Sequence, residues 1–279
     1  MKTILPSWID KSIVDGLEDV SGLLIVNRRN PADFLEGPVS IILPEPRATH
    51  PEVYQFVEEN LEKYHRIYTF DVELLKRTPN SRLLLFGTSW INQADIPMKQ
   101  SKMLGVSFLC GSKDRIIGQK LRHLIYKNQP ILELRSKKEL TFFRSAKDTI
   151  IPTVSRHGNP IIGFDSGAKK DLHLPFQFSI VVENSKQDNY FTEKIIDCFL
   201  CKTVPIYWGC PNIDKYFNTA GMILLKSTDN SILEELIHHL KRCGTELYES
   251  MHLEIEYNYN EALKYAFNYN DRLKKLCHS

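Results

Sequence analysis

The chain has 279 residues, of which 42% are hydrophobic and 25% charged, the composition of a folded protein with one large domain or two modest ones. Its 36 basic and 34 acidic side chains leave a net charge of +2, which argues against a general nucleic-acid binder with a strongly basic surface. No run approaches the roughly 18 consecutive apolar residues of a membrane-spanning helix, so we expect no transmembrane segment.

The amino-terminal segment and the cysteines indicate a reducing compartment. Pro6, Asp10 and Lys11 interrupt the first twenty residues, which therefore make a poor secretory signal. Cys198 and Cys201 form a C-x-x-C inside a helical pattern, and no second pair follows at zinc spacing. We interpret all 6 cysteines as packed thiols rather than metal or redox groups, and we predict a soluble, cytoplasmic protein.

The first part of the chain alternates between strand-like and helix-like segments. Helical spacing of apolar residues behind Pro51 predicts a helix over 50–65. Short apolar runs that end in turn residues predict buried strands at 22–28, 38–45, 66–71 and 81–87. We therefore predict a Rossmann-like α/β domain over residues 1–98, on the acceptor side of the molecule, with a polar linker around 92–102.

The alternation resumes after the linker and predicts a second α/β domain over 99–250. Its expected strands are 103–112, 176–184 and 203–209, with strands and turns over 149–167. Its expected helices are 113–128, 190–202 and 231–251. A last helix, 260–276, lies in a segment 251–279 that we expect to pack back on the first domain. Such alternation predicts mostly parallel sheets whose carboxyl ends face a central cleft, where ligands bind.

One strand-to-helix turn of the second domain concentrates hydrogen-bonding side chains. The apolar strand 178–182 ends in Glu183, Asn184 and Ser185, and a helix begins near Thr192. Glu193 and Lys194 then fall in the first helical turn, where free N–H groups and an ammonium suit a phosphate. A carboxylate beside them suits the vicinal hydroxyls of a ribose, so the turn fits a sugar nucleotide. The alternative is that Thr192 only caps the helix and that Glu193 and Lys194 are ordinary first-turn residues.

The sequence of residues 178–217, FSIVVENSKQDNYFTEKIIDCFLCKTVPIYWGCPNIDKYF, resembles the donor-binding signature of the α1,3-fucosyltransferases, glycosyltransferase family 10. The matching pieces are E-N-S at 183–185, Tyr190, T-E-K at 192–194, V-P-I at 204–206 and G-C-P at 209–211. The resemblance implies a GT-B fold with two Rossmann-like domains and inverting, metal-independent transfer. It also implies that Glu193 binds ribose, that Lys194 binds phosphate, and that Asn184 and Tyr190 line the donor site. The predicted donor-binding set in this turn is Glu183, Asn184, Ser185, Tyr190, Thr192, Glu193 and Lys194.

A second segment, 102–125, is similar to the part of the family that supplies a phosphate-binding arginine. Gly111-Ser112 stands where a Ser-Asn is usual, so the register is open. Arg115, Lys120 and Arg122 are the three candidates, and each is equally compatible with the solvated face of an amphipathic helix.

The candidate catalytic base is Glu45, which follows the strand-like segment 39–44. Its loop is similar to the family's E-S-P-T-H-type loop, whose Glu is the proposed base, and prolines on both sides of Glu45 stiffen it. A surface loop acid is the alternative, and His50 and Glu52 are substitutes if the register differs.

These features predict a glycosyltransferase that transfers L-fucose from GDP-fucose to a hydroxyl of a glycan. No Asp-x-Asp follows a strand, and Asp165 stands alone in its turn, so we predict a site without a metal and no cofactor beyond the donor substrate. The alternatives are another donor such as UDP-xylose, or a non-catalytic protein that binds a nucleotide sugar or glycan. The chain lacks the membrane anchor and paired luminal cysteines of secretory-pathway relatives, so we expect a bacterial, phage or viral source.

Overall fold

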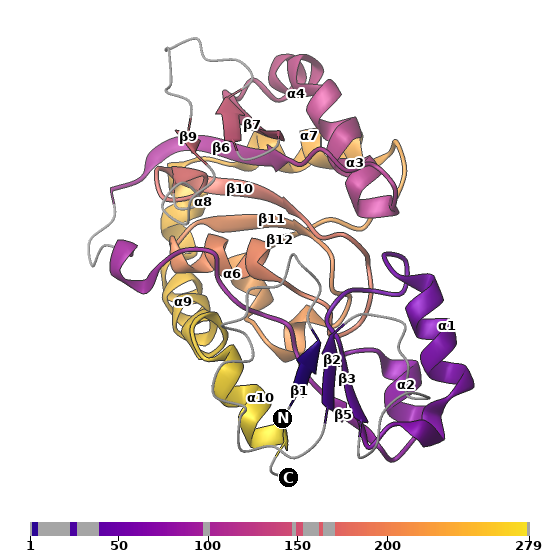
Figure 1. Ribbon diagram of the computed structural model, residues 1–279. Helices are drawn as coiled ribbons and strands as arrows, with labels where there is room; N and C mark the ends of the chain where they lie inside the picture. The colour runs from indigo at the N-terminus through magenta and orange to yellow at the C-terminus, as the bar shows by residue number, and fades with distance from the viewer. Residues whose placement is uncertain are drawn as a thin grey trace. The chain divides into compact units, whose positions relative to one another are not determined.

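The computed structural model describes residues 2–4, 23–26, 39–96, 101–146, 149–152, 162–163 and 171–277 (Figure 1). Contacts within the chain divide it into two units. Unit 1 comprises Met1–Phe86, Gln187–Tyr190 and Asn268–Ser279, and unit 2 comprises Gly87–Lys186 and Phe191–Phe267. The observed division thus falls at 86/87, whereas the sequence placed a boundary at 98/99. The chain also enters unit 1 a second time, within the segment that carries the donor-binding signature.

Unit 1 is built on a parallel sheet of five strands in the order β1-β2-β3-β4-β5. The strands are β1 (Lys2–Ile4), β2 (Leu23–Val26), β3 (Val39–Leu43), β4 (Arg66–Thr69) and β5 (Ser81–Leu83). The helix α1 (Pro51–Glu59) follows β3, and the short helix α2 (Val72–Arg77) follows β4. Buried apolar residues of β3, β4, α1 and α2 form one core, which includes Ile41, Val57, Ile67 and Leu74. This core fixes the direction in which the carboxyl ends of β3 and β4 deliver their loops.

The last helix, α10 (Tyr269–Cys277), belongs to unit 1, whereas residues 251–267 of the segment 251–279, which was expected to pack on the first domain, belong to unit 2. The rings of Tyr269 and Phe86 meet edge to face with centroids 5.6 Å apart. Arg272 Nη1 donates a hydrogen bond to the Leu85 carbonyl at 2.8 Å. The helix is therefore held to the segment that leaves the first sheet.

Unit 2 contains a seven-stranded sheet in the order β12-β11-β10-β6-β7-β8-β9. The strands are β6 (Met103–Cys110), β7 (Leu140–Ala146), β8 (Thr149–Pro152), β9 (Ile162–Gly163), β10 (Phe176–Val182), β11 (Val204–Trp208) and β12 (Ile223–Leu224). All neighbours from β12 to β7 are parallel, and β8 and β9 continue antiparallel. The strand order reverses between β6 and β10, which is a topological switch point.

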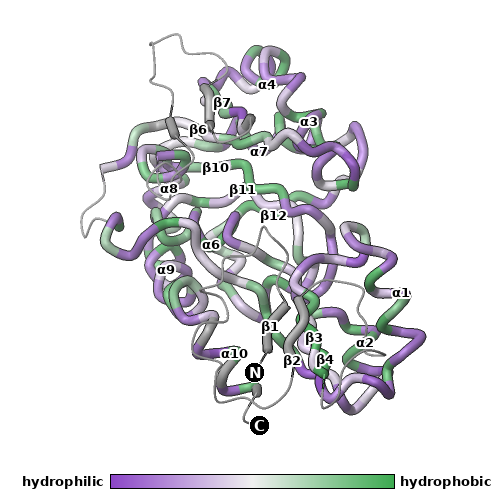
Figure 2. The backbone as a smooth tube through the Cα atoms, viewed as in Figure 1, coloured by the Kyte–Doolittle hydropathy of each residue, from purple (hydrophilic) through white to green (hydrophobic). Residues whose placement is uncertain are grey.

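Helices cover the central strands of unit 2. The main core joins β6, β10 and β11 to residues of α3 (Ile117–Lys127), α4 (Gln129–Ser136) and α7 (Ile232–Arg242). The helix α6 (Glu193–Leu200) packs against β10 and β11 and against the long helix α9 (His252–Ala266). Every residue of β10 and β11 is buried, and Figure 2 shows β10 as mostly hydrophobic. This agrees with the interior parallel strands that the apolar run predicts.

Element boundaries differ from prediction where polar breaks interrupt a pattern. The helix predicted over 50–65 ends at Glu59, and a short 3-10 turn, Leu61–Lys63, follows it. The helix predicted over 231–251 is two helices, because Cys243 and Gly244 separate α7 from α8 (Thr245–Ser250). Likewise, extended or irregular residues after Ala266 separate α9 from α10. The helices α2 and α4 and the strands β1, β7 and β12 were not predicted from the sequence.

Some predictions lie partly or wholly outside the described residues. These are the amino-terminal segment 5–22, parts of the strands expected at 22–28 and 149–167, part of the linker 92–102, and Asp165. Within the described part of the chain, no helix is long and apolar enough to cross a membrane.

Candidate functional site

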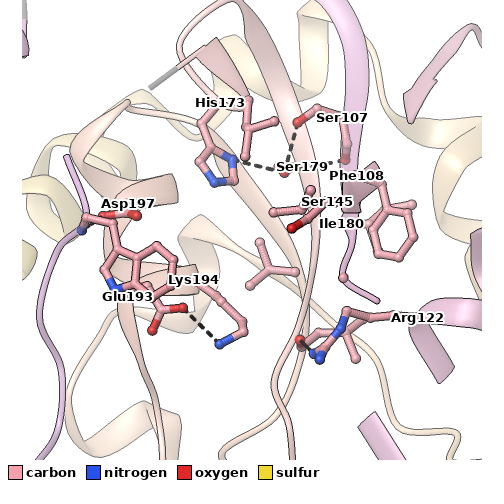
Figure 3. A pocket seen from close by; sticks show the side chains of 16 residues that line it. Ser107, Phe108, Arg122, Ser145, His173, Ser179, Ile180, Glu193, Lys194 and Asp197 are labelled. Carbon is pink, nitrogen blue, oxygen red and sulfur yellow. Dashed lines mark hydrogen bonds and ion pairs between the residues drawn. The ribbon is translucent and has the colours of Figure 1, made fainter. Parts of the chain in front are cut away.

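A cavity of about 210 Å³ lies at the switch point of unit 2, where α/β sheets bind ligands (Figure 3). Strands β6 and β10 form its floor, and Gly111 and Arg122 line it beyond the carboxyl ends of these strands. Glu193 and Lys194, from the first turn of α6, line it as well. One cavity thus contains a carboxylate and two cationic side chains that the sequence placed in the donor site.

Glu183 closes the strand-to-helix turn at its base. The side chain is fully buried, and its two carboxylate oxygens accept hydrogen bonds from Thr192, one from the backbone N–H at 2.9 Å and one from the hydroxyl at 2.8 Å. Its own N–H donates to the Trp208 carbonyl at 2.9 Å. Burial raises the pKa of this carboxyl, although the Lys194 ammonium opposes the shift. Glu183 therefore joins the end of β10 to the start of α6 and to β11. Its predicted contact with the donor stays a prediction.

Lys194 and Glu193 form an ion pair inside the cavity, with Nζ and Oε1 3.0 Å apart. Lys194 Nζ also donates to the Thr192 hydroxyl at 3.1 Å and lies 3.7 Å from a carboxylate oxygen of Glu183. Burial lowers the pKa of Lys194, but the two carboxylates outweigh it, and the net shift is upward. The ammonium is therefore charged at neutral pH, and 27% of the side-chain surface is open to solvent.

The start of α6 is capped by the protein itself. The Thr192 hydroxyl accepts a hydrogen bond from the Lys194 N–H at 3.4 Å, and Glu183 takes the Thr192 N–H. Capping satisfies donors that a helix otherwise leaves open. From the sequence, the free N–H groups of this helix start are expected to bind a phosphate. The N–H groups of Thr192 and Lys194 thus already have acceptors within the protein, and Lys194 and Arg122 add cationic side chains to the cavity.

The structure separates the three basic candidates of 113–122. Arg122 is 8% exposed and lines the cavity. Its guanidinium donates to the Val182 carbonyl at 2.6 Å and to the Asn184 side-chain oxygen at 2.8 Å. Arg115 and Lys120 are exposed and do not line the cavity. Arg122 is thus the candidate whose position suits an anionic group in this cavity.

Arg122 is positioned by the close approach of the α3 backbone to the backbone at the end of β10. The N–H of Gly118 in the first turn of α3 donates to the Asn184 carbonyl at 3.1 Å. A Cβ atom at Gly118 would lie 1.8 Å from the Glu183 carbonyl oxygen, so only glycine lets α3 dock against the end of β10. Sequence analysis did not single out this glycine, because a helical pattern alone does not reveal what its backbone touches.

The remaining predicted donor-site residues lie in two environments. Asn184 and Ser185 are half-buried at the end of β10, where Asn184 binds Arg122. Tyr190 is 1% exposed and belongs to unit 1, where its ring lies 5.0 Å from that of Phe70. Tyr190 does not line the cavity described above.

A polar cluster that the sequence did not reveal also lines the cavity (Figure 3). The Ser107 hydroxyl donates to the Ser179 hydroxyl at 2.9 Å, and His173 Nδ1 lies 3.1 Å from the same Ser179 oxygen. All three side chains are buried. Asp197 of α6 also lines the cavity and accepts hydrogen bonds from the Ser89 hydroxyl and the Trp90 N–H. The only sequence signal was a serine inside each of two otherwise apolar strands.

Glu45 follows β3 in unit 1 and is half-buried. Its carbonyl accepts a hydrogen bond from the Tyr54 hydroxyl at 2.8 Å. The two substitutes named from the sequence face each other, with His50 Nδ1 and a Glu52 carboxylate oxygen 3.8 Å apart. His50 stands at the N-cap of α1 without a side-chain cap bond. The structure therefore puts Glu45 at a strand end, as predicted, and its role as base stays a prediction.

The thiols are packed. The cysteines whose side chains the structure describes are buried and form no disulfide; they are Cys110, Cys198, Cys201, Cys210 and Cys243. Cys198 Sγ donates to the Thr203 carbonyl at 3.2 Å, and burial raises the pKa of this thiol well above its usual value. Among the residues that the structure describes, no group of three or more His, Cys, Asp or Glu side chains is arranged to hold a metal ion.

Comparisons with known proteins point to one family. Residues 145–277 match the family model of glycosyltransferase family 10 (fucosyltransferase), C-terminal part. An α-(1,3)-fucosyltransferase, FucT of Helicobacter pylori, is 32% identical over 84 residues, which are 30% of this chain and only 17% of that relative.

Solved structures match over nearly the whole chain. An α1,3-fucosyltransferase crystallised with GDP superposes with a TM-score of 0.54 at 14% identity, over 97% of this chain and 90% of the other. An α-glucosyltransferase in complex with UDP-glucose and DNA containing an abasic site gives a TM-score of 0.51 at 11% identity, over 92% and 80%. The resemblance of residues 178–217 is thereby confirmed: residues 145–277 match the family 10 fucosyltransferases, and the chain has the GT-B fold.

Proposed function

We propose that this protein is an inverting, metal-independent glycosyltransferase that transfers L-fucose from GDP-fucose to a hydroxyl of a glycan. One observation carries the proposal. A single cavity at the switch point of unit 2 brings together the Glu193 carboxylate, the Lys194 ammonium and the Arg122 guanidinium. A ligand that fits all three needs vicinal hydroxyls beside a strongly anionic group, and a nucleoside diphosphate sugar has both.

The donor would exchange contacts with the Glu193–Lys194 ion pair. Glu193 would accept hydrogen bonds from the two ribose hydroxyls, and Lys194 would turn its ammonium to the diphosphate. Lys194 keeps an anionic partner in this exchange, and Glu193 exchanges the ammonium for two neutral hydroxyl donors. Arg122 already has acceptors in Val182 and Asn184, which hold its guanidinium at the cavity wall.

The part of the cavity lined by Ser107, Ser179 and His173 is left for the nucleobase of the donor. Ser107, Ser179 and His173 offer hydroxyl and imidazole groups that both donate and accept. Guanine presents donors and acceptors along its edge and suits such a lining. An α1,3-fucosyltransferase of similar fold was crystallised with GDP-fucose, and this favours guanine over the uracil of the glucosyltransferase complex.

The transfer step needs one base and one stabilised leaving group. Glu45 would take the proton of the acceptor hydroxyl while the hydroxyl oxygen attacks the anomeric carbon from the face opposite the diphosphate. The new carbon–oxygen bond forms as the bond to the diphosphate breaks, which inverts the anomeric configuration. GDP leaves with the electron pair, and Lys194 and Arg122 would stabilise the added negative charge. One such contact is typically worth about 2–4 kcal/mol in the transition state.

The proposal is tested first by thermal unfolding with GDP-fucose, GDP-mannose, GDP, UDP, UDP-xylose, UDP-glucose and CMP, each with and without EDTA. A ligand at about 100 times its Kd stabilises the folded protein by about 2.7 kcal/mol, which raises Tm by several degrees. We expect shifts with guanine nucleotides that EDTA does not change. A shift with uracil nucleotides alone would contradict the donor, a shift abolished by EDTA would contradict metal independence, and no shift at all would contradict the site.

Release of GDP in the presence of glycan acceptors then separates an enzyme from a binding protein. We expect GDP-fucose to be consumed only when an acceptor with a suitable hydroxyl is present. Tight binding of GDP-fucose without turnover on a broad panel of glycans would favour the non-catalytic alternative.

A further inference from the structure

Asp71 lies at the centre of a network that the sequence did not reveal. The side chain is 2% exposed, caps the start of α2, and accepts the Leu74 N–H at 2.9 Å. Arg47 donates to both of its oxygens, from Nε at 2.7 Å and from Nη2 at 2.8 Å. Gln187 Nε2 donates to Oδ2, also at 2.7 Å. Four hydrogen bonds therefore converge on one carboxylate, and all of these residues belong to unit 1.

The Arg47 side of the network holds the loop that carries Glu45. Besides Asp71, the Arg47 guanidinium contacts Glu58 of α1 at 2.7 Å and lies over the Tyr54 ring at 4.7 Å from its centroid. Tyr54 in turn donates its hydroxyl to the Glu45 carbonyl. The loop is thus fixed at its first residue by Tyr54 and two residues later by Arg47.

The Gln187 side of the network holds the middle of the donor-binding turn. Residues 187–190 connect the end of β10 to the start of α6, so they lie in sequence between Asn184 and Glu193. Asn189 Nδ2 donates to the Phe70 carbonyl at 3.2 Å, and the Tyr190 ring packs on that of Phe70. This short segment is therefore anchored on the two residues that follow β4, Phe70 and Asp71.

We infer that Asp71 is a positioning residue that holds the Glu45 loop and the donor-binding turn to one anchor through Arg47 and Gln187. The inference rests on the proposed function for its catalytic meaning. Transfer requires the base and the donor to be aligned, and misplacement by about 1 Å can lower a rate by up to about 10²-fold. A shared carboxylate fixes both loops to the same point of unit 1. Asp71 touches neither reactant and acts only through the side chains bound to it.

The test changes Gln187, because substitution of Asp71 would also alter the cap of α2 and the partner of Arg47. Gln187→Glu keeps the shape of the side chain but replaces an N–H donor with a second carboxylate facing Asp71. The other charged groups around this contact are Arg47, Glu58 beyond it, and Lys186 and Asp188 in the same loop. Repulsion between the two carboxylates would displace the turn, and we expect kcat at pH 8 to fall about tenfold or more.

Acidification should reverse that loss. Asp71 disfavours ionisation of the introduced carboxyl, and its protonated form can donate to Asp71 as the amide does. We expect the ratio of mutant to wild-type kcat to rise as the pH falls from 8 to 5.5. Gln55→Glu is the matched control, because Gln55 donates to the Glu59 carboxylate at 2.9 Å on the exposed face of α1. Its kcat ratio should stay near one throughout.

A second readout does not need activity. The N–H groups of Thr49 and His50 donate to the Pro46 carbonyl and report on the Glu45 loop. In Gln187→Glu at pH 8 we expect faster hydrogen exchange at these amides than in wild type, although they lie far from residue 187 in sequence. Unchanged exchange would overturn the shared anchor. Unchanged kcat, or a loss that acid does not reverse, would overturn the positioning role. A wild-type protein that transfers no sugar would refute the proposed function, while hydrogen exchange would still decide the anchor.

Discussion

The two strand-to-helix turns to which we assign the chemistry are held in different ways. The turn between β10 and α6 is closed at its ends by its own residues, since Glu183 binds both the N–H and the hydroxyl of Thr192. The turn between β3 and α1 is held largely from outside, because Asp71 of the next strand-to-helix connection binds Arg47. Its helix starts at His50 without a side-chain cap. The ends of the β10–α6 turn thus depend on that turn's own residues, whereas its middle, through Gln187, and the β3–α1 turn, through Arg47, both depend on Asp71.

The difference assigns each turn a separate task. The β10–α6 turn presents a fixed arrangement of charge, with Glu193 and Lys194 next to the capping Thr192. The β3–α1 turn presents one carboxylate, Glu45, whose aim depends on Tyr54 and Arg47. Substitution of Lys194 should therefore weaken nucleotide binding as well as turnover, whereas substitution of Glu45 should lower turnover alone.

The largest effect on turnover should come from Glu45→Gln, which tests the role of the β3–α1 turn in the transfer step. An amide cannot take the acceptor proton, and loss of a general base lowers kcat by about 10²–10⁴-fold. We expect the Kd for GDP, measured by calorimetry, to remain within about twofold of wild type, since a base contributes to the reaction step rather than to binding of GDP. The control is Glu52→Gln on α1. Full turnover in Glu45→Gln would disprove the base assignment, and loss of turnover in Glu52→Gln would transfer the role to Glu52.

Lys194→Ala tests the role of the β10–α6 turn in nucleotide binding. Removal of one charge-assisted contact to the leaving diphosphate should cost about 2–4 kcal/mol in the transition state and also weaken GDP binding. Lys186→Ala is the matched control in the same loop, because Lys186 is exposed and donates to the Lys226 carbonyl. Titration of both variants with GDP checks the prediction. Equal affinities in Lys194→Ala and wild type would remove Lys194 from the phosphate site.

Arg122→Met tests which basic side chain of residues 113–122 contacts the diphosphate. A hydrogen bond to a charged group contributes about 1.5–3 kcal/mol, so we expect GDP affinity to fall by at least about tenfold. Arg115→Met and Lys120→Met should bind GDP as wild type does, because both side chains are exposed outside the cavity. The assignment would move to Arg115 or Lys120 if either variant, rather than Arg122→Met, lost affinity.

Asp71→Asn should give the smallest effect, a loss of folding stability. The direction in which this loss changes with pH follows from the pKa of Asp71. Burial alone would raise the pKa of Asp71, but Arg47, Leu74 and Gln187 hold it below its usual value. A lowered pKa in the folded state means that the unfolded chain binds more protons at acidic pH, so the stability from this carboxylate is present at neutral pH and lost on acidification.

We therefore expect Asp71→Asn to lower the free energy of unfolding by about 1–2 kcal/mol at pH 7, measured in urea. The difference from wild type should shrink as the pH falls below about 4. Asp214→Asn at an exposed position is the control and should show no change. A constant difference between pH 7 and pH 3 would contradict an ionised Asp71.

The contrast also explains what the sequence could predict. The β10–α6 turn could be predicted because its strand, helix cap and helix follow one another in sequence, so the local pattern of residues 176–200 indicates all three. The sequence showed Glu45 only as a polar residue after an apolar run. It did not show the residues that hold the Glu45 loop, because Arg47 and Asp71 are joined across 24 positions of sequence and no local pattern links them.

Other parts of the site were hidden for similar reasons. Arg122 could not be chosen over Arg115 and Lys120, since the choice depends on how α3 docks at Gly118. Ser107 and Ser179 come from strands that become neighbours only when β10 crosses to the other side of β6. The sequence also could not show that residues 187–190 leave unit 2 and join unit 1, because this depends on the contacts of Phe70 and Asp71.

The position of Trp90 has a practical consequence. Trp90 lines the cavity and is 42% exposed, whereas Trp208 is fully buried in the sheet of the same unit. The fluorescence of an indole in contact with water moves to shorter wavelength when a bound molecule displaces that water. The molecule thus contains one indole at its candidate site whose emission should respond to a bound molecule, one buried indole in the same unit, and the indole of Trp8. Occupancy can be followed without a label, in variants that have lost turnover as well as in the wild type.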